Sequence, residues 1–320
     1  MKDGGNFMIE NKLIQSQLNE LDCMENCNRE ELVQELTKNQ TEIKFNELLY
    51  YDHKQDELWK EHYYCNLTMD GSATLLFHEI QQLITKTHKH KNPYYINKDH
   101  YLYTWVDLHA DGKLKSIYSG EQKNPLKAIE EDYETIQKRF KGFRDLLENN
   151  RFSKKEIVQQ TSNISKQYRF NAEHVVPQSW FKAKEPMKGD LHHLFACEPE
   201  CNNVRSNFPY FDFNLCSDVD SKYYKDHCGT YEIGGFEPEY GKGAVARASL
   251  YFLIRYPGKI MKKFRKRIDV ALLKRWHLQF PVTTYEKHRN QAVFEIQGNR
   301  NPFIDFPELV EKISFALEGK

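Results

Sequence analysis

The stretch from residue 168 to residue 207 constrains the fold of this chain more than any other. It contains two short apolar segments, FNAEHVV and LHHLFA, with a loop between them, and Pro199 follows the second segment. Proline suits the first turn of a helix, because its fixed φ angle fits there and its missing N–H would be unbonded anyway. The order therefore predicts two strands followed by a helix that presents Asn202. Since the first strand carries Glu173 and His174, strand and helix can bring these polar side chains together.

Apolar spacing elsewhere predicts mainly helices. Leucine and isoleucine recur at near-helical spacing within residues 12–48, and further helices are expected over about 69–88, over about 127–149 and in the apolar segment AVARASLYFLIRY. The segments YLYTWVDLH and KLKSIYS are joined by Asp111-Gly112, which predicts a β-hairpin. We therefore expect an α+β fold that is mostly helical, with a small antiparallel sheet.

Charge is unevenly distributed, although the formal net charge is zero. Residues 1–60 hold 13 Asp and Glu against 7 Lys and Arg, so we interpret residues 1–45 as an acidic helical extension and residues 46–316 as the main domain. The extension is a candidate surface for a regulatory or oligomeric partner. Residues 255–275 hold nine Lys and Arg and one Asp, which indicates either a polyanion-binding stripe or a solvated helix face. The candidate nucleic-acid contacts of this stripe are Lys262, Lys263, Arg265, Lys266 and Arg267.

The polar residues of the 168–207 region match the needs of phosphodiester hydrolysis, which requires a base for water and a cation for the phosphate. His174 has an ordinary pKa near 6.5 and can accept the proton of a water molecule. Glu173 and Asn202 offer hard oxygen ligands, which suit Mg²⁺ or Mn²⁺ better than zinc. Arg205 can pair with a phosphate oxygen through its forked donors. A structural pair is the alternative for Glu173 and His174 taken alone.

Four segments together resemble the bacterial endonuclease I family, a branch of the ββα-metal (His-Me finger) nucleases. They are NAEHVVPQSWF, DLHHLFACEPECNNVRSNFPYFDF, GKGAVARASLYFLIRYPG and GNRNPFIDFPELV, and the likeness covers roughly residues 50–312. The resemblance implies a ββα-metal catalytic unit at about 168–207, with the general base at His174 and the metal ligands at Glu173 and Asn202. It also implies non-specific cleavage of DNA, and often of RNA, that leaves a 5′-phosphate.

The chain differs from other members at two places. Some members supply an arginine from the loop after the first strand, whereas this loop offers only Lys182, Lys184 and Lys188. A lysine is a point charge without the bidentate fork of arginine. Where other members read His-Asn after Asp-Leu, this chain has His192 and His193, which would alternate across a strand.

Several further residues have open roles. Asp190 and one of the two histidines, His192 or His193, are candidates for supporting the site, and the other histidine is more typical of a packed core. Arg247 lies in a segment that looks buried, so it either binds a phosphate or, as we prefer, pairs with a carboxylate.

Seven cysteines raise a separate question. Cys197, Cys201, Cys216 and Cys228 have the spacing C-x3-C-x14-C-x11-C, which permits a structural zinc, two disulfides or free core thiols. The Cys197–Cys201 pair flanks a helix start, where a disulfide between them is sterically awkward. Cys23 and Cys27 lie in the N-terminal helical segment and are expected to be free thiols.

Partners and location follow from the same features. We expect DNA, and RNA as a further candidate, to be the binding partner. No apolar run approaches 18 residues and the first residues lack an apolar signal core, so we expect no membrane partner and a cytoplasmic location or a non-classical export route. The competing hypotheses are a ribonuclease and a non-catalytic module of the same fold that binds nucleic acid or is held together by zinc.

Overall fold

The computed structural model describes residues 4–26, 28–68, 71–148, 153–213, 224–232 and 234–315. Its helices are α1 (Gly4–Glu25), α2 (Arg29–Phe45), α3 (Glu47–Tyr50), α4 (His53–Tyr63), α5 (Ala73–Thr87), α6 (Tyr94–Ile96), the π-helix η1 (Asn97–Val106), α7 (Pro125–Glu148), α8 (Lys154–Gln167), the 3-10 helices η2 (Gln178–Trp180) and η3 (Leu191–His193), α9 (Pro199–Arg205), α10 (Lys242–Arg255), α11 (Lys262–Arg265), α12 (Val270–Gln279), α13 (Thr284–Gln297), α14 (Pro302–Asp305) and α15 (Leu309–Lys312). Its strands are β1 (Leu114–Lys115), β2 (Gln122–Lys123), β3 (Ala172–His174), β4 (Leu194–Ala196), β5 (Tyr224–Asp226), β6 (Gly229–Glu232) and β7 (Gly235–Pro238).

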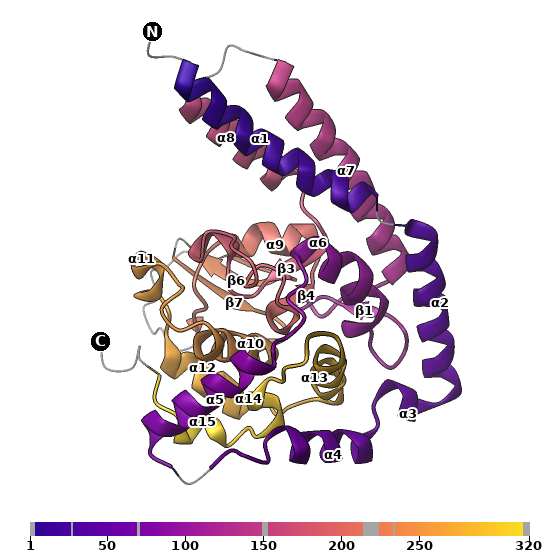
Figure 1. The fold of residues 1–320 in the computed structure, drawn as a ribbon, viewed down its shortest axis with the longest axis vertical. Helices are drawn as coiled ribbons and strands as arrows, with labels where there is room; N and C mark the ends of the chain where they lie inside the picture. The colour runs from indigo at the N-terminus through magenta and orange to yellow at the C-terminus, as the bar shows by residue number, and fades with distance from the viewer. Residues whose placement is uncertain are drawn as a thin grey trace.

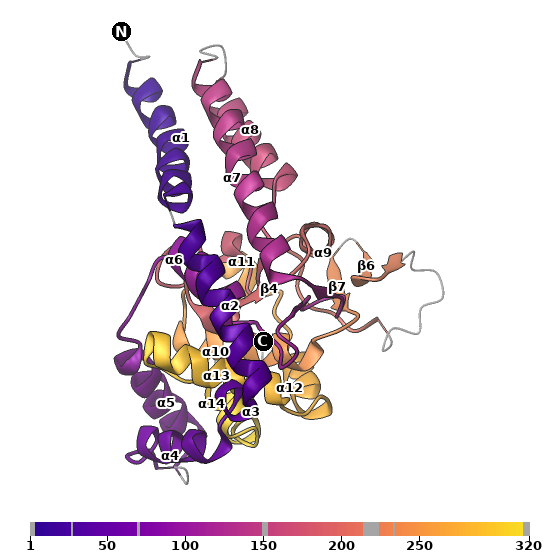
Figure 2. The ribbon, with the colours of Figure 1, turned by 90° about the vertical axis from the view of Figure 1, so that its right-hand side faces the viewer.

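Helices α1, α7 and α8 project from the rest of the molecule, and we call these three helices the arm and the remainder the body (Figures 1 and 2). α7 has a buried face along most of its length, which includes Ala128, Ile136 and Phe143. Residues at this spacing share one side of a helix, so α7 can pack along its length. α8 begins with a capping box between Ser153 and Glu156, which satisfies backbone donors at its first turn.

The body is built around α10, which is buried along most of its length. α12, α5 and α14 pack against it, and Trp276 of α12 is among the largest buried side chains. The described strands form three small antiparallel sheets, in the orders β1-β2, β3-β4 and β5-β6-β7. The expectation of a mostly helical α+β fold with little antiparallel sheet is therefore confirmed. None of the helices in the described ranges combines the length and the apolar character needed to cross a bilayer.

The helices expected over about 127–149 and in AVARASLYFLIRY are confirmed as α7 and α10, and α5 lies within the expected 69–88. The expected helix over residues 12–48 is divided into α1, α2 and the start of α3. Asn28 caps α2 by accepting hydrogen bonds from Glu30 N and Glu31 N, and Asn46 caps α3 in the same way. Asparagine favours such caps over helix interiors, so each one ends the preceding helix.

The prediction of a β-hairpin around Asp111-Gly112 is wrong for its first half. YLYTWVDLH lies in η1 and the turns after it, and only Leu114–Lys115 pairs, with Gln122–Lys123. Leu102 and Val106 are four residues apart and both fully buried, which fits one face of a helix. The aromatic and β-branched residues imitate a strand locally, but packing against α2, α7 and α13 determines the structure.

The acidic extension contributes to the same apolar cluster as the body. Leu36 and Ile43 of α2 are buried together with residues of η1 and α7, and Asn39 donates to Thr104 O at 2.9 Å. α2 is therefore packed onto the rest of the molecule, and a boundary at residue 45 stays a prediction.

Candidate active site

Strands β3 and β4 and helix α9 follow the order expected from the sequence. β3 and β4 pair antiparallel, with Ala172 opposite Ala196 and His174 opposite Leu194. Pro199 occupies the first turn of α9, as predicted. Asn202 on α9 donates through Nδ2 to Ala172 O at 2.9 Å, so this helix and the first strand contact each other directly.

Glu173 is held by hydrogen bonds inside the protein. It is 4 % exposed, and its Oε1 accepts from Tyr118 OH at 2.9 Å. Arg205 Nε lies 3.5 Å from the same oxygen. Burial raises the pKa of Glu173, whereas Arg205 and Arg169 oppose this rise. A buried carboxylate with cations on more than one side remains a candidate for an anionic ligand of a metal ion.

His174 has a defined tautomer. Its Nε2 lies 2.8 Å from Lys188 O, which can only accept, so Nε2 carries the hydrogen. Its Nδ1 lies 2.9 Å from Nε2 of Gln178, which can then only donate. Burial lowers the pKa of His174 well below its ordinary value, and His193 nearby lowers it further. The imidazole is therefore neutral at pH 7, with Nδ1 unprotonated.

Asn202 also has a fixed orientation. Its amide nitrogen donates to Ala172 O, and its Oδ1 accepts from Arg169 Nη1 at 2.5 Å. Because one partner can only accept and the other can only donate, the two amide atoms are assigned without ambiguity. The oxygen, which is the atom that a metal ion would use, faces the same side as Arg169.

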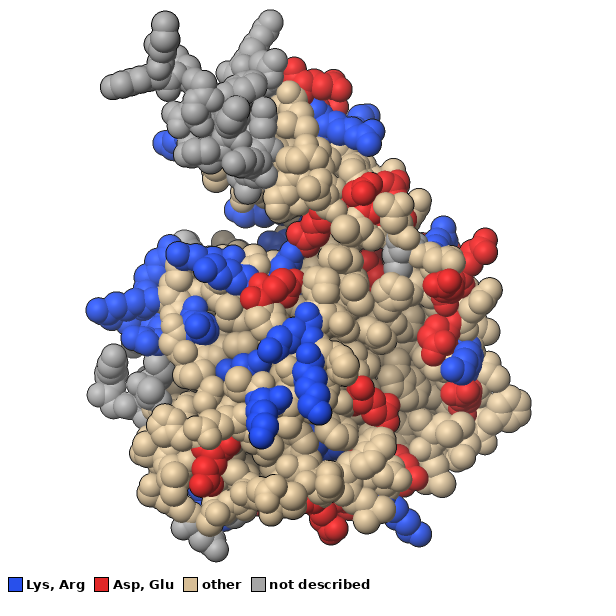
Figure 3. Space-filling model, viewed as in Figure 1, with Lys and Arg blue, Asp and Glu red and all other residues tan. Residues whose placement is uncertain are grey.

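Glu173, His174 and Asn202 all line one cavity of about 660 Å³, which we call the active-site cavity. Residues of the arm form its opposite wall, so it lies between the arm and the body. Figure 3 shows this separation and the Lys and Arg side chains that lie near it on the body. Basic side chains from both sides line the cavity, namely Arg139, Lys166, Arg169 and Lys188.

Arg205 does not reach this cavity. Its side chain is fully buried, where it donates to Val175 O at 2.8 Å and lies beside Glu173. Its guanidinium also lies 5.0 Å from the ring centre of Tyr210. The predicted pairing of Arg205 with a phosphate oxygen is therefore corrected, because its Nη atoms donate to Ser206 O and Val175 O and its Nε faces Glu173.

Arg247 is likewise internal. It makes two hydrogen bonds to Glu286, at 2.6 and 2.9 Å, and donates to Phe280 O at 2.8 Å. Both partners of this ion pair are buried. The structural alternative holds, and the assignment of Arg247 as a nucleic-acid contact is corrected because no part of the pair is open to a ligand.

Asp190, His192 and His193 are buried behind the cavity. His192 and His193 lie in the 3-10 helix η3, so the expected alternation across a strand is wrong. Asp190 accepts from Tyr251 OH and Tyr256 OH at 2.8 Å each. Only His193 touches the catalytic candidates, with its ring centre 5.4 Å from that of His174.

The predicted lysine contacts fall in two places. Lys182 and Lys184 are exposed, whereas Lys188 is half-buried in the cavity, where it is paired with Glu20 of α1. In the basic stripe, Lys262, Lys263 and Lys266 are exposed, and Arg265 and Arg267 are partly exposed. Phe264 of α11 stacks on Trp180 with ring centres 5.6 Å apart, which places α11 next to the segment that follows β3.

Sequence reasoning missed the two arginines of the cavity. Arg169 lies three residues before the start of β3 and contacts Asn202, and Arg139 on α7 donates to the carbonyls of Tyr168 and Ser165. Arg169 has a weak signal in the sequence, since it lies four residues before Glu173 in an aromatic segment, YRF. Arg139 has none, because only the tertiary packing of α7 brings it to the site.

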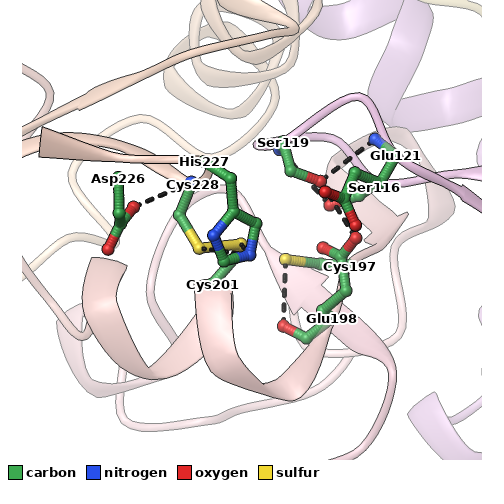
Figure 4. Close-up of a disulfide and its surroundings, with 9 residues drawn as sticks. All are labelled: Ser116, Ser119, Glu121, Cys197, Glu198, Cys201, Asp226, His227 and Cys228. Carbon is green, nitrogen blue, oxygen red and sulfur yellow. Dashed lines mark hydrogen bonds between the residues drawn. A yellow bond between two sulfur atoms is a disulfide. The ribbon is translucent and has the colours of Figure 1, made fainter.

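The cysteine cluster contains a disulfide between Cys201 and Cys228, which joins α9 to the turn between β5 and β6 (Figure 4). Cys197 is free and buried, and Cys216 lies outside the described residues, as does Cys27. The disulfide pairs two of the four thiols of the predicted zinc site, and a zinc ion at this cluster stays a prediction. Figure 4 also shows the ring of His227 beside the disulfide. Cys23 is a free thiol, as expected.

The donor set of the cavity fits a hard divalent cation. A buried carboxylate, Glu173, and an amide oxygen of Asn202 line one polar cavity, and such oxygens are the ligands that Mg²⁺ and Mn²⁺ prefer. Two protein ligands leave coordination positions for water and phosphate. The orientation of the Asn202 amide, fixed by Ala172 O, presents an oxygen rather than an N–H group to the cavity.

Comparisons with known proteins identify the family of the chain. The model of the family Endonuclease I matches residues 75–308. An extracellular ribonuclease of Bacillus amyloliquefaciens is 33 % identical over 162 residues, which cover 45 % of this chain and 53 % of that protein. An extracellular deoxyribonuclease of Aeromonas hydrophila is 33 % identical over 122 residues, or 37 % of this chain and 50 % of that protein.

An Endonuclease-1 of Buchnera aphidicola is 32 % identical over 124 residues, which cover 38 % of this chain and 47 % of that protein. The chain thus spans about half the length of the curated relatives it matches. The family model covers most of the chain, including β3, β4 and α9, and the resemblance noted in the sequence is confirmed. This chain belongs to the endonuclease I family.

Proposed function

We propose that this protein is a metal-dependent endonuclease that hydrolyses phosphodiester bonds with little sequence preference. One observation carries the proposal: a neutral imidazole, a buried carboxylate and an oriented amide oxygen line the same cavity. The names of the relatives, which are nucleases acting on DNA or RNA, support the same reaction class.

His174 acts as the general base in the proposed reaction. A water molecule replaces the Gln178 amide at Nδ1, gives its proton to that nitrogen and forms a bond from its oxygen to phosphorus. The bond between phosphorus and the 3′-oxygen breaks, the 3′-oxygen takes a proton from solvent, and a 5′-phosphate is left. Lys188 O keeps the ring oriented throughout by accepting from Nε2.

Glu173 and Asn202 would hold the metal ion, since they supply its two protein oxygens. When bound, Mg²⁺ or Mn²⁺ supplies positive charge to the phosphate and to the leaving oxygen. Tyr118 and Arg205 keep Glu173 in place from behind. Supporting hydrogen bonds of this kind fix a ligand before the metal arrives.

Arg169 is the proposed phosphate contact, in place of the loop arginine of some family members. Its Nη1 lies against Asn202 Oδ1, and its Nε is buried without a hydrogen-bond partner among the described residues. A phosphate oxygen entering beside Asn202 would meet the free donors of this fork. A guanidinium offers paired donors that match two phosphate oxygens.

DNA is the proposed substrate, and RNA is a second candidate because the relatives include an extracellular ribonuclease. The proposed step uses water and not the 2′-hydroxyl of a ribose, so the reaction itself does not distinguish the two. Cleavage of DNA and RNA oligonucleotides of equal length and sequence measures the preference directly.

The decisive experiment replaces the base. His174→Ala is expected to lower the cleavage of supercoiled plasmid in Mg²⁺ by about 10²- to 10⁴-fold, because proton transfer to a positioned base is lost. His78→Ala is the matched control, since His78 is exposed on α5. Cleavage by the wild type should stop in EDTA and return with added Mg²⁺ or Mn²⁺. Undiminished nicking by His174→Ala contradicts the proposal, and binding without cleavage by the wild type in Mg²⁺ favours the non-catalytic module.

We propose an exported location for the protein rather than a cytoplasmic one. The disulfide between Cys201 and Cys228 is typical of proteins that fold in an oxidising compartment. Thiol labelling of the protein taken from its native source, followed by mass spectrometry, tests whether this pair is oxidised there.

A further inference from the structure

Helix α1 forms part of the wall of the active-site cavity. Gln17, Glu20, Leu21 and Met24 line the cavity together with Glu173, His174 and Asn202. α1 also packs against α6, α7 and α8, so the arm brings it to the cavity rather than leaving it in solvent. The N-terminal helix thus lies where a bound nucleic acid would have to pass.

The contact that α1 makes in the cavity is electrostatic. The carboxylate of Glu20 pairs with the ammonium of Lys188, and both side chains are more than two-thirds buried. The backbone oxygen of the same Lys188 accepts from His174 Nε2 at 2.8 Å. Glu20 therefore pairs with the side chain of the residue whose backbone oxygen orients the proposed base.

The charge of α1 opposes that of the cavity. From residue 14 to residue 25 the helix has Glu20, Asp22 and Glu25 and no Lys or Arg, whereas Arg139, Arg169 and Lys188 line the cavity. A cavity lined by cations attracts a polyanion, and a carboxylate placed among those cations reduces that attraction. Glu20 supplies the negative charge that a bound phosphate would otherwise bring to these cations.

The attachment of α1 combines this ion pair with an apolar face. Ile14, Leu18, Leu21 and Met24 are buried and lie three or four residues apart, which places them on one side of the helix. The face packs into the cluster that includes residues of η1 and α7. α1 is therefore a docked element whose position depends on both apolar contacts and charge.

We propose that α1 is a built-in competitor of nucleic acid, which holds the phosphate-binding side of the cavity until a polyanion displaces Glu20 from Lys188. This inference rests on the proposed function, because it names how the same cavity is regulated. The competing groups are in one molecule, so the ligand binds more weakly than it would to a cavity without α1. Affinity is reduced by the fraction of molecules in which α1 is docked.

A substitution that removes only the charge tests the proposal. Glu20→Gln keeps the length and helix preference of the side chain, and Asp22→Asn removes the same charge from an exposed position of the same helix. Binding of a fluorescein-labelled DNA duplex is measured by anisotropy in EDTA, where cleavage does not interfere. Cleavage of the same duplex in Mg²⁺ is measured in parallel.

The proposal expects Glu20→Gln to tighten binding by about three- to tenfold at low salt, and Asp22→Asn to change it less than twofold. The difference between the two variants should shrink as salt is added, because the charges are screened. Equal affinities of the two variants, or weaker binding by Glu20→Gln, overturn the proposal. Tighter binding by Glu20→Gln without any cleavage by the wild type leaves the competitor intact and removes the nuclease function.

Hydrogen exchange of the wild-type protein provides a test that needs no variant. Saturating DNA duplex in EDTA should increase exchange of the backbone amides in residues 14–25, because displaced α1 loses its packing. Amides of α10, which is buried in the body, serve as the internal control. Greater protection of α1 with DNA bound would mean that the helix closes over the ligand, and the proposal would then be wrong.

Discussion

The arginines of the core and the arginines of the cavity have different partners. Arg247 and Arg300 are buried and paired with carboxylates, Glu286 for the first and Asp305, together with Asp56, for the second. Arg169 and Arg139 donate only to neutral oxygens among the hydrogen bonds found within the described ranges.

This difference separates structural from functional cations. An ion pair with a carboxylate cancels the charge, so a core arginine contributes geometry and hydrogen bonds. An arginine that donates to carbonyl and amide oxygens keeps its full charge and can still attract a phosphate.

The largest effect should follow from breaking a core pair. Arg247→Ala leaves Glu286 buried without its cation, and we expect it to lower the free energy of unfolding by about 3–5 kcal/mol. Urea unfolding measures this change. Arg169→Ala, the matched substitution in the cavity, should change stability by about 1 kcal/mol or less. Unchanged stability of Arg247→Ala combined with weaker DNA binding would return Arg247 to the nucleic-acid contacts.

Two buried histidines should make the stability of the core sensitive to acid. Burial lowers the pKa of His192 and of His288 to about 4, whereas the unfolded chain protonates both near 6.5. Stability is therefore complete above pH 6.5 and is lost as the pH falls from 6.5 toward 4. Between pH 7 and pH 5 the loss from these two groups should be roughly 3 kcal/mol in urea unfolding.

A histidine substitution checks the origin of this loss. His288→Gln should remove about half of the pH dependence of these two groups, although it lowers stability at every pH. His78→Gln should leave the pH dependence unchanged, because His78 is exposed. Equal pH profiles for all three proteins would assign the acid sensitivity to other groups.

Arg169 should matter for activity and little for folding. We expect Arg169→Ala to lower kcat/KM for DNA by roughly ten- to a hundredfold, because a charged donor to the phosphate is lost. Arg169→Lys should recover only part of the loss, since lysine lacks the fork. Arg144→Ala, exposed on α7 of the same arm, is the control. Wild-type kcat/KM in Arg169→Ala would refute its role as the phosphate contact.

The smallest effect is expected at the basic stripe. Lys262→Ala combined with Lys263→Ala should weaken DNA binding severalfold. The slope of the logarithm of the binding constant against the logarithm of the salt concentration should become less steep by up to about two. Anisotropy titrations over a range of salt concentrations measure both quantities. Because backbone phosphates are the same in every sequence, the loss should not depend on the duplex used. An unchanged salt dependence would make the stripe a solvated face.

The sequence predicts a helix correctly where the local apolar pattern alone determines the structure. α7 and α10 have regular apolar faces, and Pro199 marks the start of α9, so short-range rules suffice. η1 was misread as a strand because its aromatic residues satisfy both patterns and only its neighbours in space select the helix. The segment LHHLFA also looks like one strand, but only Leu194–Ala196 pairs, and His192 and His193 lie in η3.

The site could be predicted in part. Glu173, His174 and Asn202 converge because strand and helix are close in sequence, whereas the roles of the residues around them depend on the tertiary structure. Spacing alone could not reveal that Arg205 is buried beside Glu173 and that Arg169 lines the cavity. The partners of the imidazole, Lys188 O and Gln178, come from a loop whose path has no periodic signal.

Helix α9 has only seven residues, too few to be stable alone, yet it carries Asn202. The bond from Cys201 to Cys228 and the bond from Asn202 to Ala172 O tether it on two sides. The conformational freedom of this proposed ligand is therefore given up when the chain folds. A cation entering the proposed site would meet an amide oxygen that is already oriented, and its affinity would not carry the entropic penalty of organising a loop.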